Sequence, residues 1–184
     1  MVIIGITGTI GAGKGTLVEY LADKKGFAHY SVRTFLLEKI RELGMPENRD
    51  SMYNLANELR SVKGPSYVVD TLYERAVISG KDCVIESIRT TGEVDSLRAK
   101  GSFILLAVDA DPDKRYQRIV MRQSETDRVS LATFRENEAR EMTTDDPGKQ
   151  NLHRCIELAD FVLTNNGTKE ELFLHLGEIL NKIQ

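Results

Sequence analysis

Cysteine is scarce in this sequence of 184 residues, with only Cys83 and Cys155, and their separation matches no metal or redox motif. A disulfide scaffold is not required, because a chain of this length can bury a sizeable core without cross-links. We expect both thiols to be reduced and the protein to be cytoplasmic, since disulfides are rare in that compartment.

Long hydrophobic runs are also absent, and none approaches the roughly 18 residues that a membrane span requires. The apolar start, residues 1–6, has no basic leader and continues into glycines, so we expect no secretory signal. Basic residues do not dominate: 25 Lys and Arg face 28 Asp and Glu, which gives a net charge of -3. We therefore expect neither a membrane nor a nucleic acid as a partner, although a local basic site is compatible with this balance.

Short apolar runs alternate with amphipathic stretches along what we expect to be one domain, residues 1–184. Strands are predicted at residues 2–7, 28–32, 83–86, 103–108 and 161–164. Helices are predicted at residues 13–24, 34–43, 51–62, 66–78, 90–100, 112–122, 131–142 and 168–183. Because the strands are continuously apolar, they predict a parallel sheet that is covered on both faces. Ligands of such sheets bind beyond the carboxyl ends of the strands.

A glycine-rich stretch, GTIGAGKGT at residues 8–16, follows the first predicted strand and opens the first helix. Gly8, Gly13 and Lys14 have the spacing of the phosphate-binding P-loop. Backbone N–H groups and the helix N-terminus would face phosphate oxygens there, and Lys14 would add a point charge. Gly15 stands where the motif has Ser or Thr, so Thr16 is the hydroxyl that could reach Mg²⁺ or its water shell. The pattern predicts ATP and Mg²⁺ as cofactors.

The remaining chain favours a small kinase over other P-loop proteins. A GTPase would need an Asn-Lys-x-Asp segment after a late strand, which is absent, and a large motor ATPase would need more chain. A kinase needs arginines, because it brings two anionic substrates together and stabilises the transferred group. Five candidates follow predicted strands, lie in a predicted helix or belong to the basic stretch 114–128; in chain order they are Arg33, Arg60, Arg89, Arg118 and Arg122. The last two are spaced i,i+4 and share a helix face, where we expect a lid.

Glu86 ends the third predicted strand, on the side where ligands bind. A carboxylate there can hold the water shell of Mg²⁺ or accept a proton from an attacking oxygen. His29, His153 and His175 show no ligand spacing, so we expect surface or packing roles for them. His29 is the nearest of the three to the expected acceptor side.

Three stretches resemble the nucleoside monophosphate kinase branch of P-loop kinases. The start, VIIGITGTIGAGKGT, is similar to dephospho-CoA kinases, and its Gly-Lys-Gly-Thr is shared with adenylate kinases. The middle, VIESIRTTGEVDSLRAKG at residues 84–101, resembles phage deoxynucleoside monophosphate kinases and archaeal relatives of dephospho-CoA kinase. The end, ADFVLTNNGTKEEL at residues 159–172, resembles the closing strand and helix of the dephospho-CoA and phage enzymes.

The resemblance implies a three-layer α/β P-loop fold with a five-stranded parallel sheet and helices on both faces. It also implies an acceptor-binding helical region at about 31–80 and a helical lid at about 114–146. The predicted donor-phosphate residues are Gly8, Gly11, Ala12, Gly13, Lys14, Gly15 and Thr16. The predicted catalytic residues are Lys14, Glu86, Arg89, Arg118 and Arg122, the acceptor-binding residues are Arg33, Arg60 and Arg89, and the Mg²⁺ ligands are Thr16 and Glu86.

Departures from the related enzymes leave the acceptor open. Residues 29–33, HYSVR, lack the Asp-x-Asp stretch that dephospho-CoA kinases carry after the second strand. The Asp-Gly-x-Pro-Arg strand end of adenylate kinases is not matched closely either. The leading hypothesis is transfer of the γ-phosphoryl group of ATP to a nucleoside or deoxynucleoside monophosphate. The alternatives are a dephospho-CoA kinase and a non-catalytic ATP-binding regulatory module, and the oligomeric state is not determined.

Overall fold

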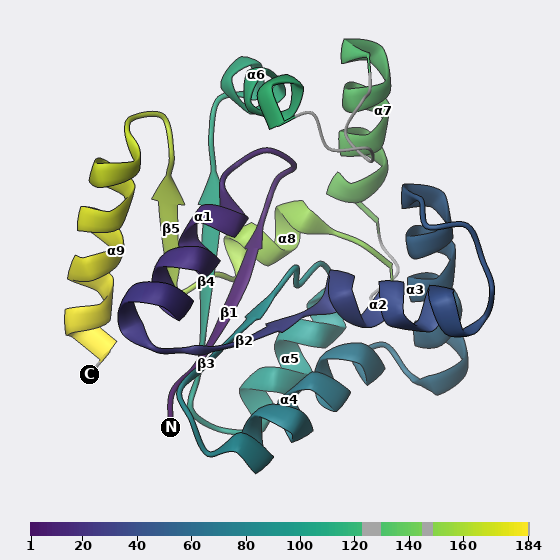
Figure 1. Ribbon diagram of the computed structural model, residues 1–184, viewed down its shortest axis with the longest axis horizontal. Coiled ribbons are helices and arrows are strands. Elements are labelled where there is room, and N and C mark those ends of the chain that lie inside the picture. Colours follow the sequence, from purple (N-terminus) through teal and green to yellow (C-terminus); the bar gives the residue numbers. More distant parts are fainter. Residues whose placement is uncertain (123–129, 145–148, 184) are drawn as a thin grey trace.

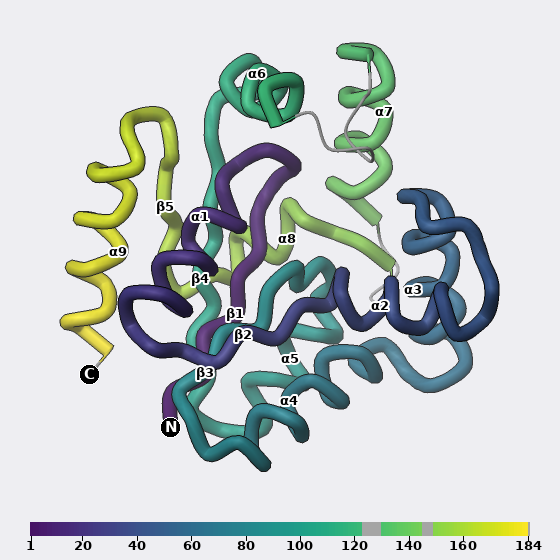
Figure 2. The backbone as a smooth tube through the Cα atoms, in the orientation of Figure 1, coloured from purple at the N-terminus to yellow at the C-terminus, as the bar shows by residue number. Residues whose placement is uncertain are grey.

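A five-stranded parallel sheet in the order β2-β3-β1-β4-β5 forms the centre of the part of the chain that the structure describes (Figures 1 and 2). This structure is a computed structural model, and it describes residues 1–122, 130–144 and 149–183. The strands are β1 (Ile3–Gly8), β2 (Ala28–Ser31), β3 (Cys83–Glu86), β4 (Phe103–Asp109) and β5 (Phe161–Thr164). The predicted three-layer α/β P-loop fold is thereby confirmed, with boundaries within two residues of those expected for each strand.

The central strand β1 is buried at all six positions, as its continuous apolar sequence predicts. It pairs in parallel with β3 and β4, and Ile6 lies opposite Glu86 on one side and Leu106 on the other. On the next strand, Ser31 at the end of β2 lies opposite the same Glu86. The carboxyl ends of these strands therefore meet at one edge of the sheet, where the functional residues were expected.

Helices cover both faces of the sheet (Figure 1). On one face, α1 (Lys14–Glu19), its π-helical continuation η1 (Tyr20–Lys24) and α9 (Lys169–Ile183) pack against residues such as Ile4 and Ile6. On the other face, the helices pack against residues such as Ile3 and Ile85. These helices are α2 (Val32–Glu42), α3 (Arg49–Lys63), α4 (Tyr67–Ser79), α5 (Thr91–Ala99) and α8 (Leu152–Glu157). Successive residues of a strand thus point into two separate hydrophobic clusters.

Two further helices, α6 (Pro112–Arg122) and α7 (Leu131–Met142), lie beyond the carboxyl edge of the sheet, and we call them the lid helices (Figure 1). Ile119 and Phe134, one from each, form a small cluster with Ile10 of the loop after β1. The lid was predicted at about 114–146. Its residues 123–129, which include Arg128, and 145–146 lie outside the described part of the chain.

Two local features differ from the sequence prediction. Residues 13–24 were expected to form one helix, whereas the structure changes from α1 to the π-helical η1 at Tyr20. The helix α8 was not expected at all, because six residues are too few to show a helical repeat in the sequence. Its N-terminus is capped by Asn151, whose side chain accepts a hydrogen bond from the backbone N–H of Arg154.

Both cysteines are buried, and neither forms a disulfide with the other. Burial raises the pKa of Cys83 to about 11 and that of Cys155 to about 12, so both thiols stay protonated at neutral pH. Among the described helices, none has the length and apolar character that crossing a membrane would demand.

Candidate functional site

The loop between β1 and α1 adopts backbone angles that only glycine tolerates easily. Gly8 has φ 142°, and a Cβ atom there would lie 2.0 Å from the carbonyl oxygen of Val108. Gly13 has φ 108°, and its Cβ would lie 2.4 Å from the side-chain nitrogen of Asn165. That same amide of Asn165 donates a hydrogen bond of 2.8 Å to the carbonyl of Ala12. The turn after β5 therefore holds the loop in its shape.

Lys14, the first residue of α1, folds back over this loop. Its Nζ atom donates hydrogen bonds to the carbonyl oxygens of Gly8, at 2.7 Å, and Thr9, at 2.8 Å. The pKa of Lys14 is lowered to about 7, mainly by burial and then by the nearby guanidinium of Arg89, whereas the carboxylates of Glu141 and Glu86 act in the opposite direction. An anionic ligand beside Lys14 would raise this pKa again, because it would stabilise the ammonium form.

Binding of a nucleoside triphosphate is therefore expected to take up a proton at Lys14. Around pH 8 the ligand-free lysine is mostly neutral, so uptake approaches one proton per site, and affinity falls as the pH rises above about 7. Calorimetry of a non-hydrolysable Mg·ATP analogue in two buffers of different ionisation enthalpy would measure this uptake. Identical apparent enthalpies in both buffers at pH 8 would contradict the prediction.

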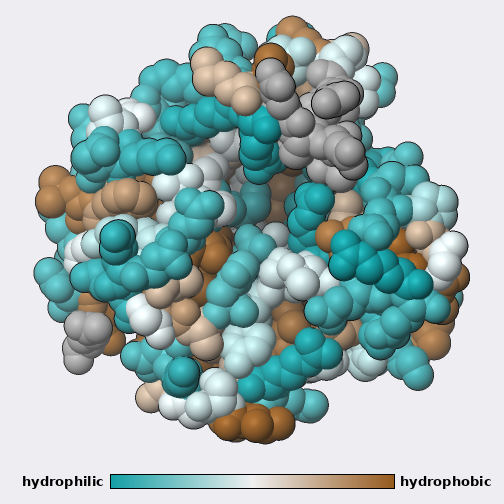
Figure 3. Space-filling view, viewed as in Figure 1, coloured by the Kyte–Doolittle hydropathy of each residue, from teal (hydrophilic) through white to brown (hydrophobic). Residues whose placement is uncertain are grey.

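A pocket of about 750 Å³ opens at the carboxyl edge of the sheet, beside the P-loop. Figure 3 shows this face of the molecule hollowed near its centre, below α6. Among the described lining residues, eight are basic: Lys14, Arg33, Arg49, Arg60, Arg89, Arg118, Arg122 and Lys169. Three are acidic: Glu19, Glu86 and Glu141. A strongly positive pocket in a chain whose net charge is -3 favours anionic ligands.

Most residues singled out from the sequence line this one pocket. They are Gly11, Gly13, Lys14, Gly15, Thr16, Arg33, Arg60, Glu86, Arg89, Arg118 and Arg122. Gly8 and Ala12 do not line it: Gly8 packs against β4, and Ala12 is buried beneath the loop. At Gly15 a Cβ atom would meet nothing within 4 Å, so packing does not demand this departure from the usual motif.

Glu86 is held at the edge of the pocket by two side chains from β2. The hydroxyl of Ser31 donates to Oε1 of Glu86 at 2.7 Å, and Nε2 of His29 lies 3.4 Å from the same oxygen. Burial alone would raise the pKa of Glu86, but the hydrogen bonds from His29 and Ser31 outweigh it and hold that pKa below its usual value. A carboxylate with a lowered pKa is a weaker proton acceptor, so this environment favours contact with the water shell of a cation over proton abstraction. His29, expected to be a surface or packing residue, thus contacts the candidate site.

The turn after β3 directs Arg89 toward the pocket. Ser87 has φ 68°, a left-handed conformation that is costly for a residue other than glycine. The next residue, Ile88, is anchored on both sides, because its N–H donates to the carbonyl of Ile6 and its carbonyl accepts from the hydroxyl of Thr7. Strain in this turn is therefore sustained by contacts with the buried central strand.

Arg60 and Glu93 form an ion pair beneath the pocket, with side chains only 2% and 0% exposed. Nε and Nη2 of Arg60 donate to Oε1 of Glu93, at 3.1 and 2.8 Å. The other oxygen of Glu93 accepts the backbone N–H groups of Arg89 and Thr90. The sequence indicated Glu93 only as a capping-box residue of α5, which it is, but it also orients the two arginines.

The remaining predicted arginines approach from the lid helices and α2. Arg118 donates from Nη2 to the carbonyl of Asn165, at 2.8 Å, and its Nη1 has no hydrogen-bond partner among the described residues. Arg122 lines the pocket from the last turn of α6, and Arg33 lines it from the first turn of α2. These residues come from separate segments, so only the tertiary fold brings them together.

Four residues of the site were missed by sequence reasoning: Arg49, Glu141, Gln150 and Asn165. One signal was available for the first of them, since Arg49 and Arg60 are eleven residues apart, which is close to three helical turns and places both on one face of α3. Nothing local marks Glu141, Gln150 or Asn165, because their importance depends on contacts with distant segments.

Thr16 and Glu86 are suitable partners for Mg²⁺ bound together with phosphate. Both line the pocket, and both offer the oxygen atoms that this cation prefers. No group of three or more metal-binding His, Cys, Asp or Glu side chains occurs within residues 1–122, 130–144 and 149–183. A magnesium ion here would thus complete its coordination with phosphate oxygens and water, as Mg²⁺ commonly does.

Comparisons with known proteins place this geometry in context. The AAA domain family matches residues 4–143. A UPF0200 protein of Methanococcus maripaludis is 30% identical over 186 residues, covering 100% of this chain and 98% of its own. Among solved structures, TT1252 from Thermus thermophilus has a TM-score of 0.65 at 24% identity, covering 100% of this chain and 98% of its own. Shikimate kinase from Bacteroides thetaiotaomicron has a TM-score of 0.57 at 15% identity, and 98% of each chain is covered. The fold is therefore that of P-loop kinases.

Proposed function

This chain belongs to the AAA domain family and to the UPF0200 proteins, and from that premise we propose that it is a kinase that uses Mg·ATP. It would transfer the γ-phosphoryl group to a small acceptor, for which a nucleoside or deoxynucleoside monophosphate is our first candidate. The observation that carries the proposal is that one pocket is lined both by the P-loop and by arginines from α2, α3, α6 and the turn after β3.

A protein that only bound ATP would need the P-loop but not this number of additional cations. Phosphoryl transfer needs them, because charge on the transferred group and on both substrates must be neutralised while the reacting atoms are aligned. The pocket volume of about 750 Å³ falls in the range of small-molecule sites, about 300 to 1,000 Å³. Both features support catalysis over simple binding.

The positions of the side chains support the following proposed roles. Lys14 binds the outer phosphates of the donor, and the backbone N–H groups of residues 11–16 surround the remaining phosphate oxygens. Arg118 and Arg122 face the pocket from α6, on the side where charge on the transferred group needs stabilisation. Arg89 extends from the turn after β3 and orients the acceptor.

Glu86 keeps its carboxylate ionised, and with Thr16 it would hold the water shell of a bound cation. Mg²⁺, when bound, would neutralise phosphate charge and orient the phosphate oxygens. Ser31 and His29 fix the orientation of the Glu86 carboxylate through its Oε1 atom. In this arrangement the protein supplies positioning and electrostatic stabilisation rather than a covalent intermediate.

An acceptor panel tests the proposal. We expect the rate of ADP release from Mg·ATP to rise at least about tenfold above the acceptor-free rate with one or more nucleoside or deoxynucleoside monophosphates, because positioning of both substrates accelerates transfer. Dephospho-CoA belongs in the same panel, and stimulation by it alone would favour dephospho-CoA kinase activity. ATP binding by calorimetry without stimulation by any acceptor would instead support the regulatory module.

A further inference from the structure

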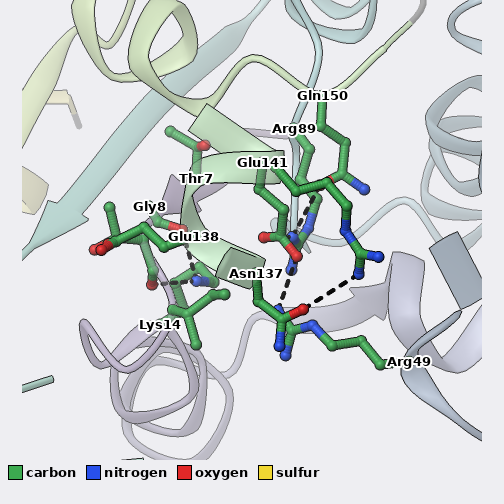
Figure 4. Close-up of polar contacts among 12 residues, drawn as sticks. Thr7, Gly8, Lys14, Arg49, Arg89, Asn137, Glu138, Glu141 and Gln150 are labelled. Atoms are coloured by element: carbon green, nitrogen blue, oxygen red, sulfur yellow. Dashed lines mark hydrogen bonds and ion pairs between the residues drawn. The ribbon is translucent and has the colours of Figure 1, made fainter. Parts of the chain in front are cut away.

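A carboxylate from the lid lies in the part of the pocket expected to bind the acceptor. Glu141, in the last turn of α7, has a side chain only 4% exposed. Its Oε1 accepts a hydrogen bond of 2.8 Å from Nη2 of Arg49, and its Oε2 contacts Nη1 of Arg89. Figure 4 shows Glu141 pointing from α7 between these two arginines. The same nitrogen of Arg89 also donates to Gln150, at 3.2 Å.

Two guanidinium nitrogens near Glu141 have no hydrogen-bond acceptor among the described residues, even though its carboxylate is close by. Nη1 of Arg60 is buried and has no hydrogen-bond partner among the described residues, although Arg60 lines the same pocket. Nε of Arg49 is likewise buried without a partner in the described part of the chain. Buried guanidinium nitrogens without partners are costly, so this region is suited to an anion with more acceptor oxygens than Glu141 provides.

The charge of the arginine cluster also favours a phosphate group over the carboxylate of Glu141. Burial opposes ionisation of Glu141, but Arg89 and Arg49 outweigh that effect and hold its pKa below the usual value. Glu141 is therefore an anion that supplies one negative charge and two oxygens to a cluster of arginines. The phosphate of a monoester carries a charge of about -1.5 to -2 at pH 7 and three strong acceptor oxygens, which matches that cluster better.

We infer that Glu141 occupies the position of the acceptor's phosphate group and is displaced from Arg49 and Arg89 when a phosphate monoester binds. The inference rests on the proposed function, because it assigns the acceptor class of that same pocket. It makes Glu141 a specificity-determining residue: a neutral hydroxyl compound has no charge with which to replace it, whereas a phosphate dianion does.

Displacement would also weaken the attachment of the lid to α3. A second contact joins the same two helices, in which Nη1 of Arg140 lies 3.3 Å from the carboxylate of Asp50 and its guanidinium lies over the ring of Tyr53. Both of these partners are in the first turns of α3, close to Arg49. After loss of the Glu141 contacts, this more exposed pair would have to hold the two helices together, so binding of phosphate should loosen the C-terminal end of α7.

Inorganic phosphate is the probe for the test, titrated by calorimetry in the presence and in the absence of a saturating non-hydrolysable Mg·ATP analogue. Glu141→Gln is compared with Glu136→Gln, which removes the same charge from an exposed position on α7. We expect Glu141→Gln to bind phosphate about tenfold more tightly than Glu136→Gln, because the internal competitor has lost its charge. Equal or weaker binding would overturn the inference and would make Glu141 an organiser of the arginines.

The unmodified protein gives an independent measurement in case Glu141→Gln folds poorly. Hydrogen exchange of the amides at the C-terminal end of α7 should become faster when phosphate is added to the donor-loaded protein. Unchanged or slower exchange would contradict displacement of Glu141. Binding of the ATP analogue is measured separately, so its failure would refute the kinase proposal. The difference between the two variants would still report on the Glu141 site, since neither substitution touches the P-loop.

Discussion

Replacing Lys14 with alanine is expected to reduce phosphoryl transfer by at least about 10²- to 10³-fold, the range for loss of one preorganised electrostatic group. The ammonium group of Lys14 lies against the loop that is proposed to receive the donor phosphates, and the backbone N–H groups carry no full charge that could replace it. In the structure it contacts the carbonyls of Gly8 and Thr9, so its loss removes no contact within the hydrophobic core. The variant should therefore stay folded.

The measurement is acceptor-stimulated ADP release at saturating substrates, with a urea titration to confirm the fold. Lys182→Ala is the matched control, because Lys182 is an exposed lysine in the last turn of α9 and does not line the pocket. We expect it to retain most of the activity. Undiminished transfer by the Lys14→Ala variant would refute the proposed role of Lys14 and its loop in binding the donor phosphates.

Replacing Glu93 with alanine is expected to lower the free energy of unfolding by about 3 to 5 kcal/mol, the usual range for breaking one side of a buried ion pair. The change leaves the guanidinium of Arg60 in the interior without its counter-charge. It also removes the acceptor for the backbone N–H groups of Arg89 and Thr90. Since a domain is typically stable by about 5 to 15 kcal/mol, this loss is a large share of the total.

The chain offers a matched control at α9. Thr168 and Glu171 form the same reciprocal capping hydrogen bonds as Thr90 and Glu93, but Glu171 is exposed. Glu171→Ala should cost only about 0.5 to 2 kcal/mol, the range for a lost cap. Equal urea midpoints for the two variants would show that the pair of Arg60 and Glu93 adds nothing beyond capping. Glu93→Ala should also weaken phosphate binding, because Arg60 and Arg89 lose their common anchor.

The two glutamates that contact the pocket arginines have opposite consequences in these tests. Loss of Glu93 is expected to weaken the binding of an anionic acceptor, because this residue holds Arg60 and the turn before Arg89 in place. Loss of charge at Glu141 is expected to strengthen the binding of that acceptor, because Glu141 competes with it for Arg89. Their comparison therefore separates residues that build the arginine cluster from one that fills it.

The strands, the glycine-rich loop and the start of α5 could be predicted from the sequence, because short patterns of neighbouring residues specify each of them. Continuous apolar runs identified all five strands, and glycine spacing identified the loop at residues 8–16. The capping pattern of Thr90 and Glu93 predicted the start of α5 correctly. Each of these signals spans fewer than ten residues and reflects a constraint that neighbouring residues impose on one another.

The arrangement of charges within the pocket could not be predicted in the same way. Arg60 was expected to face the acceptor, yet its Nε and Nη2 atoms both donate to a carboxylate 33 residues away, and Nη1 alone of its three nitrogens lacks a partner among the described residues. Glu141 and Asn165 carry no local pattern that distinguishes them from solvated surface residues, and Arg49 is indicated only by its helical spacing from Arg60. Which of many basic and acidic side chains meet depends on the packing of α3, α7 and the turn after β5.

The amino-acid sequence by itself determined a parallel α/β fold, a phosphate-binding loop and an excess of arginine near the carboxyl ends of the strands. Periodicity, glycine spacing and charge composition can be read from the sequence without knowledge of the contacts between distant segments. Only the tertiary structure decided which arginines are already paired, that His29 and Ser31 hold Glu86, and that Glu141 lies between Arg49 and Arg89. Electrostatic pairing acts through space between segments far apart in the sequence, so it becomes visible only when the helices are placed around the sheet.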